Sequence, residues 1–356
     1  MKQIVRGVGR RFRGWGRWLS RPARPLVRRW EVCRFRALPG VEFLVVVDPA
    51  SPDPVSRAVR DGSNPNDVGL ELMRRFAGPG DRVLDLGGHV GLFALTAAAL
   101  GCEVLTVEAS HHNAGLLAAS ARLNGFRNLH LVNCAIGAGT SLVPFCEDGP
   151  FGSVASGLVP RPVTSRVPVL SAETLLAGLG WDRLAFVKID VEGSEVAAVA
   201  GLRRFLEPAR APAVLFESNE HTLHFFGQTP EALHGAFAAA GYRCYQVGAR
   251  RLTAVSAGEM QGPTCVDYLA VKGPLPEPPA GWAVADDLTE VELTGQLHAA
   301  LTDANADVRA SAARRLARAP ARLLASPLIQ AGLRRLRHDG DGRVRDAAAW
   351  HARRAA

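Results

Sequence analysis

The chain has 356 residues, 47% of them hydrophobic and 21% charged, which suits a folded globular protein with one large or two smaller domains. Its formal net charge is +8, but residues 1–40 carry Lys2 and eleven arginines against Glu31, a net of +11, which leaves 8 − 11 = −3 for the rest. A mildly acidic main body argues against a nucleic-acid partner, and no apolar run reaches the ~18 residues of a membrane-spanning helix. We therefore expect a cytoplasmic protein.

The first 40 residues form a basic arm in which arginines alternate with Trp15, Trp18 and Trp30. Such a segment can lie on an anionic membrane surface, which would make the protein membrane-peripheral, or bind an acidic partner. Two other interpretations stay open, namely a poorly ordered leader and a mitochondrial presequence.

From residue 41 the hydrophobic pattern alternates between strands and helices. The expected strands are 41–47, 82–87, 103–109, 129–137, 184–193, 211–219, 243–248 and 266–273. The expected helices are 66–77, 91–101, 112–125, 194–207 and 230–242, and shorter strand-like segments occur around 142–146 and 166–170. This alternation predicts an α/β domain over 41–275 with a mostly parallel, doubly wound sheet and an antiparallel terminal strand pair.

A proline-rich linker occupies residues 273–282, and the pattern after it is helical. We assign residues 276–356, which include most of this linker, to a tail outside the α/β domain. Residues 303–318 and 339–354 repeat one motif, with Val308 and Val344 at corresponding places. The motif resembles the second helix of HEAT-like repeats, although two copies fall short of the ~3 that bury a solenoid core. We expect this tail to pack on the main domain or on a protein partner, and a plain Ala/Arg-rich helical extension is the alternative.

The six cysteines are scattered without CxxC pairs, so we expect neither disulfides nor a metal site.

A glycine turn follows the strand at 82–87 and has the sequence Asp85-Leu86-Gly87-Gly88-His89-Val90-Gly91. Its glycines fit D-x-G-x-x-x-G and not the G-x-G-x-x-G of dinucleotide sites. Asp85 would repel a pyrophosphate, whereas S-adenosylmethionine has a sulfonium, an ammonium and no phosphate. The turn therefore favours S-adenosylmethionine, with Asp85 near its amino-acid end and Gly87 giving the backbone close access.

Glu108 lies near the end of the next strand, where a carboxylate can accept hydrogen bonds from both ribose hydroxyls. NAD sites use the same device, so Glu108 supports S-adenosylmethionine only together with the turn.

The segment "FVKIDVEGSE", residues 186–195, places Lys188, Asp190, Glu192 and Glu195 at the end of an expected central strand. Ligands of parallel sheets bind outside the carboxyl ends of the strands. A structural salt bridge is the alternative for Lys188, but clustered carboxylates are costly without a task.

The turn, Glu108, "NCAIG" at 133–137, "VKIDVEGSE" at 187–195, the strand ending in "FES" and the closing "DYLAV" together resemble the FkbM family of S-adenosylmethionine-dependent methyltransferases. The resemblance covers about 66–273 and implies a class I, Rossmann-like methyltransferase sheet. Family members mostly methylate hydroxyl oxygens of sugars, glycans and natural products. Two departures are His89, where the family usually has an asparagine, and Ala138, where it often has an acid.

The resemblance and the residue chemistry together predict three groups of site residues. The cofactor-binding group is Asp85, Gly87, Gly88, His89, Gly91, Glu108, Ala109, Ala135 and Asp190. The catalytic group, with a carboxylate as the first candidate for the base, is Glu192, Asp190, Lys188 and His89. The substrate-binding group is Glu217, His221 and His224, and the two histidines are also candidates for the base.

The sequence therefore predicts an O-methyltransferase that acts on a small-molecule or glycan hydroxyl by in-line methyl transfer. A methyltransferase fold without catalysis that serves as a protein scaffold is the first alternative, and an NAD-dependent oxidoreductase is the second.

Overall fold

The computed structural model describes residues 30–147, 152–155, 163–208, 211–255, 265–285, 294–295, 297–298, 301–302, 306–316 and 324–354. Residues 1–29 of the basic arm and parts of the tail, including 303–305, lie outside the described residues.

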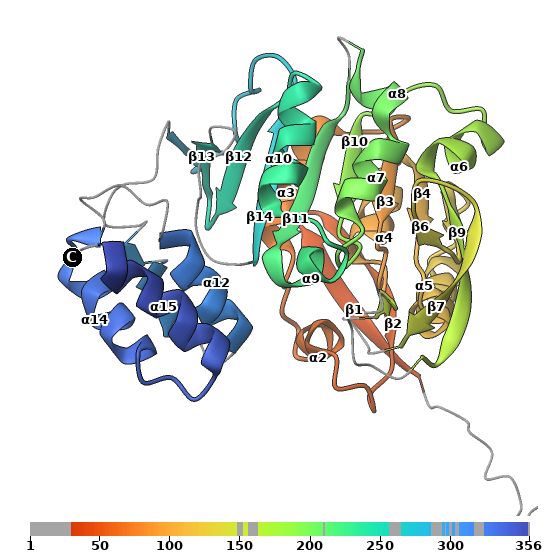
Figure 1. Cartoon of the computed structure of the whole chain (residues 1–356). Helices are drawn as coiled ribbons and strands as arrows, with labels where there is room; N and C mark the ends of the chain where they lie inside the picture. Colours follow the sequence, from red (N-terminus) through yellow and green to blue (C-terminus); the bar gives the residue numbers. More distant parts are fainter. Residues whose placement is uncertain are drawn as a thin grey trace, which may run out of the picture.

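A nine-stranded sheet forms the centre of the described chain (Figure 1), in the order β15-β13-β12-β14-β11-β10-β3-β4-β5. Its strands are β3 (Arg82–Leu86), β4 (Glu103–Val107), β5 (Leu129–Val132), β10 (Phe186–Ile189), β11 (Ala213–Asn219), β12 (Arg243–Gly248), β13 (Arg251–Val255), β14 (Cys265–Val271) and β15 (Ala283–Ala285). The five strands from β5 to β11 are parallel, and β14 runs antiparallel between β11 and β12. This order confirms the expected doubly wound sheet with an antiparallel terminal pair. Strands β13 and β15 extend the sheet beyond that expectation.

Helices cover both faces of the sheet, because each parallel strand pair needs a crossover that returns over one face. Helices α3 (Asp67–Phe76) and α4 (Leu92–Ala99) lie behind the sheet in Figure 1, and α7 (Glu195–Gly201) and α10 (Pro230–Ala239) lie in front. The remaining helices of the domain are α2 (Pro54–Arg60), α5 (His111–Leu123), α6 (Ala172–Gly178), α8 (Arg203–Leu206) and α9 (Glu220–Phe225). Two apolar cores result, one on each side of the sheet.

A hairpin of β1 (Glu31–Leu38) and β2 (Val41–Val47) packs over α4 and α5. Strand β1 falls within the range 1–40 that the sequence analysis assigns to the arm, so the folded part starts before residue 41. The β2 edge is satisfied by α5, because Ser120 Oγ accepts from the Val46 amide at 2.8 Å and Asn124 Oδ1 from the Leu44 amide at 2.9 Å. Helix α5 thereby holds the hairpin in place.

The expected strand 129–137 divides into β5 and the short β6 (Ala135–Ile136). Strand β6 joins a second sheet, in the order β6-β9-β7-β8, with β7 (Ser141–Cys146), β8 (Ser153–Val154) and β9 (Ser165–Leu170). This small sheet forms a wall beside the end of β4.

The described tail contains α12 (Ala306–Leu316), α14 (Pro327–Leu336) and α15 (Gly342–Arg354). These helices share a separate apolar core that includes Leu301, Leu316, Leu333 and Val344. Helix α12 also contacts α9, so the expected packing on the main domain is present, whereas the HEAT-like repeat stays a prediction. Among the described residues, no helix is long and apolar enough to cross a membrane.

Candidate functional site

The glycine turn after β3 has no side chain at Gly87, Gly88 or Gly91, where the chain crosses the end of the sheet. Gly87 has φ +87°, and a Cβ there would lie 1.7 Å from the carbonyl oxygen of Asp190. A Cβ on Gly88 would lie 2.3 Å from Thr106 Oγ1. Gly91, at φ +97°, begins α4 and packs against Leu117. The glycines thus let β3, β4 and β10 come together beneath a turn with few side chains.

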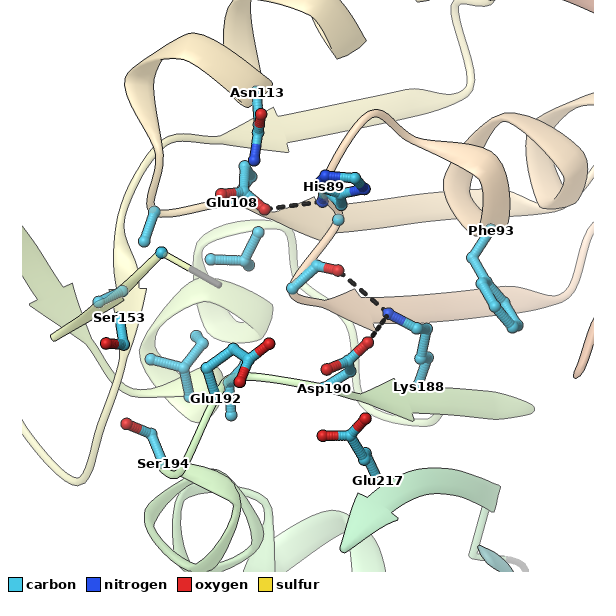
Figure 2. A pocket seen from close by; sticks show the side chains of 18 of the residues that line it. His89, Phe93, Glu108, Asn113, Ser153, Lys188, Asp190, Glu192, Ser194 and Glu217 are labelled. Carbon is cyan, nitrogen blue, oxygen red and sulfur yellow. Dashed lines mark hydrogen bonds and ion pairs between the residues drawn. The ribbon is translucent and has the colours of Figure 1, made fainter. Parts of the chain in front are cut away.

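Glu108 lies directly beside this turn, just beyond β4. Its Oε2 accepts a hydrogen bond from the backbone amide of His89 at 2.7 Å (Figure 2), and its Oε1 accepts from the amide of Ser110 at 2.7 Å. Only 8% of Glu108 is exposed, and burial raises the pKa of its carboxyl. Each carboxylate oxygen retains a second lone pair, so Glu108 can still accept from a ligand.

A cavity of about 190 Å³ opens between the turn, β4 and β10. Ten predicted site residues line it: Gly87, Gly88, His89, Glu108, Ala109, Ala135, Lys188, Asp190, Glu192 and Glu217. The predicted residues Asp85, Gly91, His221 and His224 are not among its lining residues. The structure therefore brings together residues from four strand ends that are separated by up to 130 positions in the sequence.

Asp85 lies beneath the cavity and not on its surface. It is 1% exposed, Thr106 Oγ1 donates to its Oδ2 at 3.2 Å, and Lys188 Nζ lies 3.8 Å from its Oδ1. Burial raises the pKa of Asp85 to about 6, although the charge of Lys188 opposes this shift. The geometry supports a structural pairing with Lys188, and direct contact of Asp85 with a ligand stays a prediction.

Lys188 connects the turn to the end of β10. Its Nζ donates to the carbonyl of Gly87 at 3.1 Å and to Asp190 Oδ2 at 3.2 Å, as Figure 2 shows. The ammonium also lies 5.2 Å from the ring centroid of Phe93. Burial opposes the charge, but Asp190 and Asp85 hold the pKa of Lys188 above its usual value.

The loop after β10 presents Glu192 to the cavity in a left-handed conformation, with φ 52°. Buried Glu195 supports this loop, because its Oε1 accepts from the amides of Val191 and Gly193 at 3.1 Å each. Gly193 packs so closely on α9 that a Cβ would meet the Thr222 carbonyl at 2.5 Å. The K-I-D-x-E-G-x-E motif therefore includes supporting residues that fix the backbone at Glu192.

A second cavity of about 240 Å³ adjoins the first, and Asn66, Phe93, Lys188, Asp190 and Glu217 line both. Asp67 and Asp267 add further carboxylates to its wall.

Glu217 lies between these two cavities, near the end of β11. Its Oε2 accepts from the thiol of Cys265 at 3.1 Å. Burial, with the neighbouring charge of Asp190, raises the pKa of Glu217 to about 8, so its carboxyl is mostly protonated at neutral pH.

The predicted histidines His221 and His224 lie on α9 and line neither cavity. The ring of His221 packs edge-on against Phe225 at 4.6 Å between centroids. Helix α9 follows β11 but leads its histidines away from the cavity, which sequence position alone did not indicate. Their role in substrate binding stays a prediction without support from the cavity geometry.

Several lining residues were not predicted as site residues from the sequence. Phe93 looks like an ordinary core position of α4, and Ser153 and Val154 lie on the short strand β8. Asn113, in the first turn of α5, also lines the cavity. None carries a motif, and only the packing of the second sheet and α5 places them there.

The comparisons with known proteins bear on the same segment of the chain. Residues 85–244 match the model of the methyltransferase FkbM domain. The ribosomal protein L11 methyltransferase of Thermus thermophilus is 31% identical over 156 residues, which are 42% of this chain and 56% of that protein. The chain thus spans little more than half the length of this curated relative.

Two solved methyltransferases are similar in structure. The 16S rRNA N2 G1207 methyltransferase of T. thermophilus, in complex with AdoMet and guanosine, has 15% identity and a TM-score of 0.37 over 70% of this chain and 52% of its own. The precorrin-6y C5,15-methyltransferase of Geobacter metallireducens has 12% identity and a TM-score of 0.34. The match covers 58% of this chain and 88% of that protein. Both scores are below 0.5, so the class I methyltransferase fold rests on the domain match and on the strand order of this chain.

S-adenosylmethionine is the cofactor of such a domain, and the residues of the first cavity fit it. The bare backbone at Gly87 and Gly88 gives close access, and Glu108 supplies acceptors for hydroxyl donors. Carboxylates outnumber cationic groups on the lining, and the one lysine is engaged by Asp190 and Gly87. This lining suits a cationic ligand without phosphate better than a dinucleotide.

Proposed function

We propose that this chain is an S-adenosylmethionine-dependent O-methyltransferase that acts on a hydroxyl of a sugar, glycan or natural product. The observation that carries the proposal is the group of acidic side chains of Asp190, Glu192 and Glu217, which line one space beside the glycine turn (Figure 2). A hydroxyl acceptor gains from such a group, because carboxylates accept its hydrogen bonds and can remove its proton.

The cofactor would be held along the first cavity. Glu108 would accept from its ribose hydroxyls, Ala109 and Ala135 would lie against its base, and the Gly87–His89 backbone would follow its length. When bound, S-adenosylmethionine supplies a methyl group on a sulfonium that can pass in line to an acceptor oxygen. Alignment of the two reactants is the main task of the protein.

Glu192 is the proposed general base. Its loop is fixed by Glu195 and Gly193, so the carboxylate approaches the acceptor space without a search through loop conformations. Lys188 is proposed to hold Asp190 and the turn in place rather than to exchange a proton, because its pKa is raised. Glu217, protonated at neutral pH, can donate a hydrogen bond to an acceptor oxygen as well as accept one.

The test of this proposal is a methyl-transfer assay with S-adenosylmethionine and a panel of glycans and hydroxylated small molecules. In Glu192→Gln we expect turnover to fall about 10²–10⁴-fold, because the base is lost, while the dissociation constant of S-adenosylhomocysteine changes less than about twofold. Glu173→Gln, at an exposed position on α6, is the matched control with unchanged turnover. Full turnover in Glu192→Gln would remove this residue from the mechanism.

A protein acceptor is the second candidate, because the curated relative is named for the methylation of a ribosomal protein. Ribosomal protein L11, added as an acceptor to the same assay, tests this candidate. A structured RNA added as an acceptor tests the prediction that the chain has no nucleic-acid partner. Isothermal titration with NADH tests the oxidoreductase alternative, and tight NADH binding would contradict the cofactor assignment.

The two ends of the chain lie outside the proposed active site and have partners of their own in this proposal. We propose that the helical tail, with its HEAT-like motif, and the basic arm provide contacts to a protein or to an anionic membrane surface. Co-sedimentation of the full chain with anionic vesicles tests the membrane contact.

A further inference from the structure

Asp53 lies in the connection between β2 and α2, and it is 2% exposed. Its carboxylate caps the N-terminus of α2 by accepting from the amides of Val55 at 2.9 Å and Ser56 at 3.0 Å. The same carboxylate lies 3.3 Å from Nε2 of His89, which belongs to the glycine turn. Two segments 36 positions apart are therefore joined by one side-chain pair.

The contact with Asp53 bears on the backbone conformation of His89. Its φ is 50°, in the left-handed region where a non-glycine residue is strained. In this conformation its amide donates to Glu108 Oε2 at 2.7 Å. A ring held by Asp53 therefore helps to hold the amide that orients Glu108.

The electrostatics of the pair agree with this geometry. Burial would raise the pKa of Asp53, but the interaction with the His89 ring and the hydrogen bonds from Ser56 lower it to about 2. Asp53 is therefore an anion at physiological pH, and the His89 ring lies against it.

A second pair ties the same connection to the other side of Glu108. His112 Nε2, in the first turn of α5, lies 3.2 Å from Asp48 Oδ2, just after β2. The cap of this helix, Ser110, donates its amide to Glu108. Val55, in the first turn of α2 and two residues after Asp53, lines the first cavity. Residues 48–55 thus reach the cofactor cavity at Val55 and are attached to both segments that hold Glu108.

We infer that Asp53 is a positioning residue for the cofactor site: acting through the His89 ring, it fixes the turn so that Glu108 presents its free lone pairs to the ribose. The inference rests on the proposed function for the identity of the ligand. It also explains how His89 is held in a left-handed conformation, because the ring has support from a distant segment.

The simplest alternative is that Asp53 only caps α2. Asp53→Asn tests this alternative, because asparagine is also a preferred N-cap and keeps one capping oxygen, but it removes the carboxylate that faces His89. Ser171→Ala is the matched control, since Ser171 caps α6 through the amide of Thr174 and does not line either cavity.

The experiment is isothermal titration of S-adenosylhomocysteine into the full-length wild type, Asp53→Asn, His89→Asn, the double variant and Ser171→Ala. We expect Asp53→Asn to weaken binding about tenfold with little change in melting temperature, and to have less than a twofold effect in the His89→Asn background. Ser171→Ala should lower the melting temperature and leave binding unchanged.

Amide hydrogen exchange without any ligand gives a second, independent result. The His89–Gly91 amides should exchange several-fold faster in Asp53→Asn than in the wild type. The inference is overturned, and the proposed function is not, if Asp53→Asn binds S-adenosylhomocysteine as tightly as the wild type. The same holds if Asp53→Asn weakens binding equally in the wild-type and His89→Asn backgrounds. If the wild type does not bind S-adenosylhomocysteine, the proposed function is overturned. If the His89–Gly91 amides then exchange equally fast in Asp53→Asn and the wild type, the positioning role is overturned as well.

Discussion

At the scale of single residues, the site is dominated by buried carboxylates with raised pKa values. Burial raises the pKa of Asp85 to about 6, of Glu195 to about 7 and of Glu217 to about 8. Of these three, Asp85 is the one whose charge Lys188 faces, at 3.8 Å. Such an arrangement costs stability, which is typical of groups retained for a function.

Glu217 makes this cost measurable as a pH dependence. Its folded pKa of about 8 exceeds the ~4.3 of an unfolded glutamate, so between these values the folded state binds a proton that the unfolded state does not. Stability must then fall as the pH rises from about 4 to about 8. We expect the melting temperature of the wild type to fall between pH 6 and pH 9, and that of Glu217→Gln to fall less.

The control for this prediction is Glu103→Gln, because Glu103 lies exposed at the start of β4. Its melting curve should follow the wild type at every pH. Equal slopes for the wild type and Glu217→Gln would mean that Glu217 does not carry the raised pKa.

At the scale of elements, the site depends on strand ends that approach one another more closely than side chains permit. Gly87 on the turn meets the carbonyl of Asp190 after β10, and Gly193 meets the carbonyl of Thr222 on α9. These contacts fix where the carboxylates of the β10 loop lie relative to the turn. The cradle is therefore as much a product of backbone packing as of acidic side chains.

Gly87→Ala tests this dependence. The added methyl group would lie 1.7 Å from the Asp190 carbonyl at a φ of +87°, so β3 and β10 must separate or the turn must rearrange. We expect loss of S-adenosylhomocysteine binding by more than about 100-fold and a destabilisation of several kcal/mol, by calorimetry and urea unfolding. Gly139→Ala, with no atom within 4 Å of the new methyl group and no positive φ, should behave as the wild type. Normal binding by Gly87→Ala would show that the turn adapts.

At the scale of the whole molecule, the described tail helices have an apolar core separate from the two cores of the sheet. Arg309 and Asp339 join α12 to the turn before α15 through two hydrogen bonds of 2.7 and 2.8 Å. Helix α12 contacts the main domain at α9. The tail is thus a small unit with its own packing.

Leu336→Ala tests this independence, because Leu336 is fully buried in the tail core. We expect a cost of about 2–5 kcal/mol, confined to the unfolding of the tail. Differential scanning calorimetry should show a low-temperature transition that moves down while the main transition and S-adenosylhomocysteine binding stay constant. A single transition that shifts as a whole would show that tail and sheet unfold together.

Much of the fold could be predicted from the sequence. The helical and alternating apolar patterns predicted α3, α4, α5 and α10 to within a few residues, and the parallel strands likewise except for the end of the strand expected at 129–137. These patterns are local consequences of burying one face. The glycine turn, Glu108 and the K-I-D-x-E-G-x-E segment were predicted to meet, and they line one cavity. The rule that strand ends of a parallel sheet share one edge was sufficient for this.

Other features of the site depend on contacts that no local pattern encodes. The division of 129–137 into β5 and β6, and the wall made by the second sheet, follow from pairing with β9 more than thirty residues later. The histidines of α9 were predicted near the substrate but lie outside both cavities, because the direction of a helix after its strand is set by packing.

The sequence by itself determined the class of sheet, the bare turn and the acids at the strand ends, since each follows from residue type and spacing along a short segment. Only the tertiary structure decided that Asp85 lies beneath the cavity, that burial gives Glu217 a pKa of about 8, and that Asp53 meets His89. The physical reason is that burial and electrostatic pairing depend on the distance between segments in space. For Asp53 and His89, that distance is set where the β2–α2 connection meets the glycine turn.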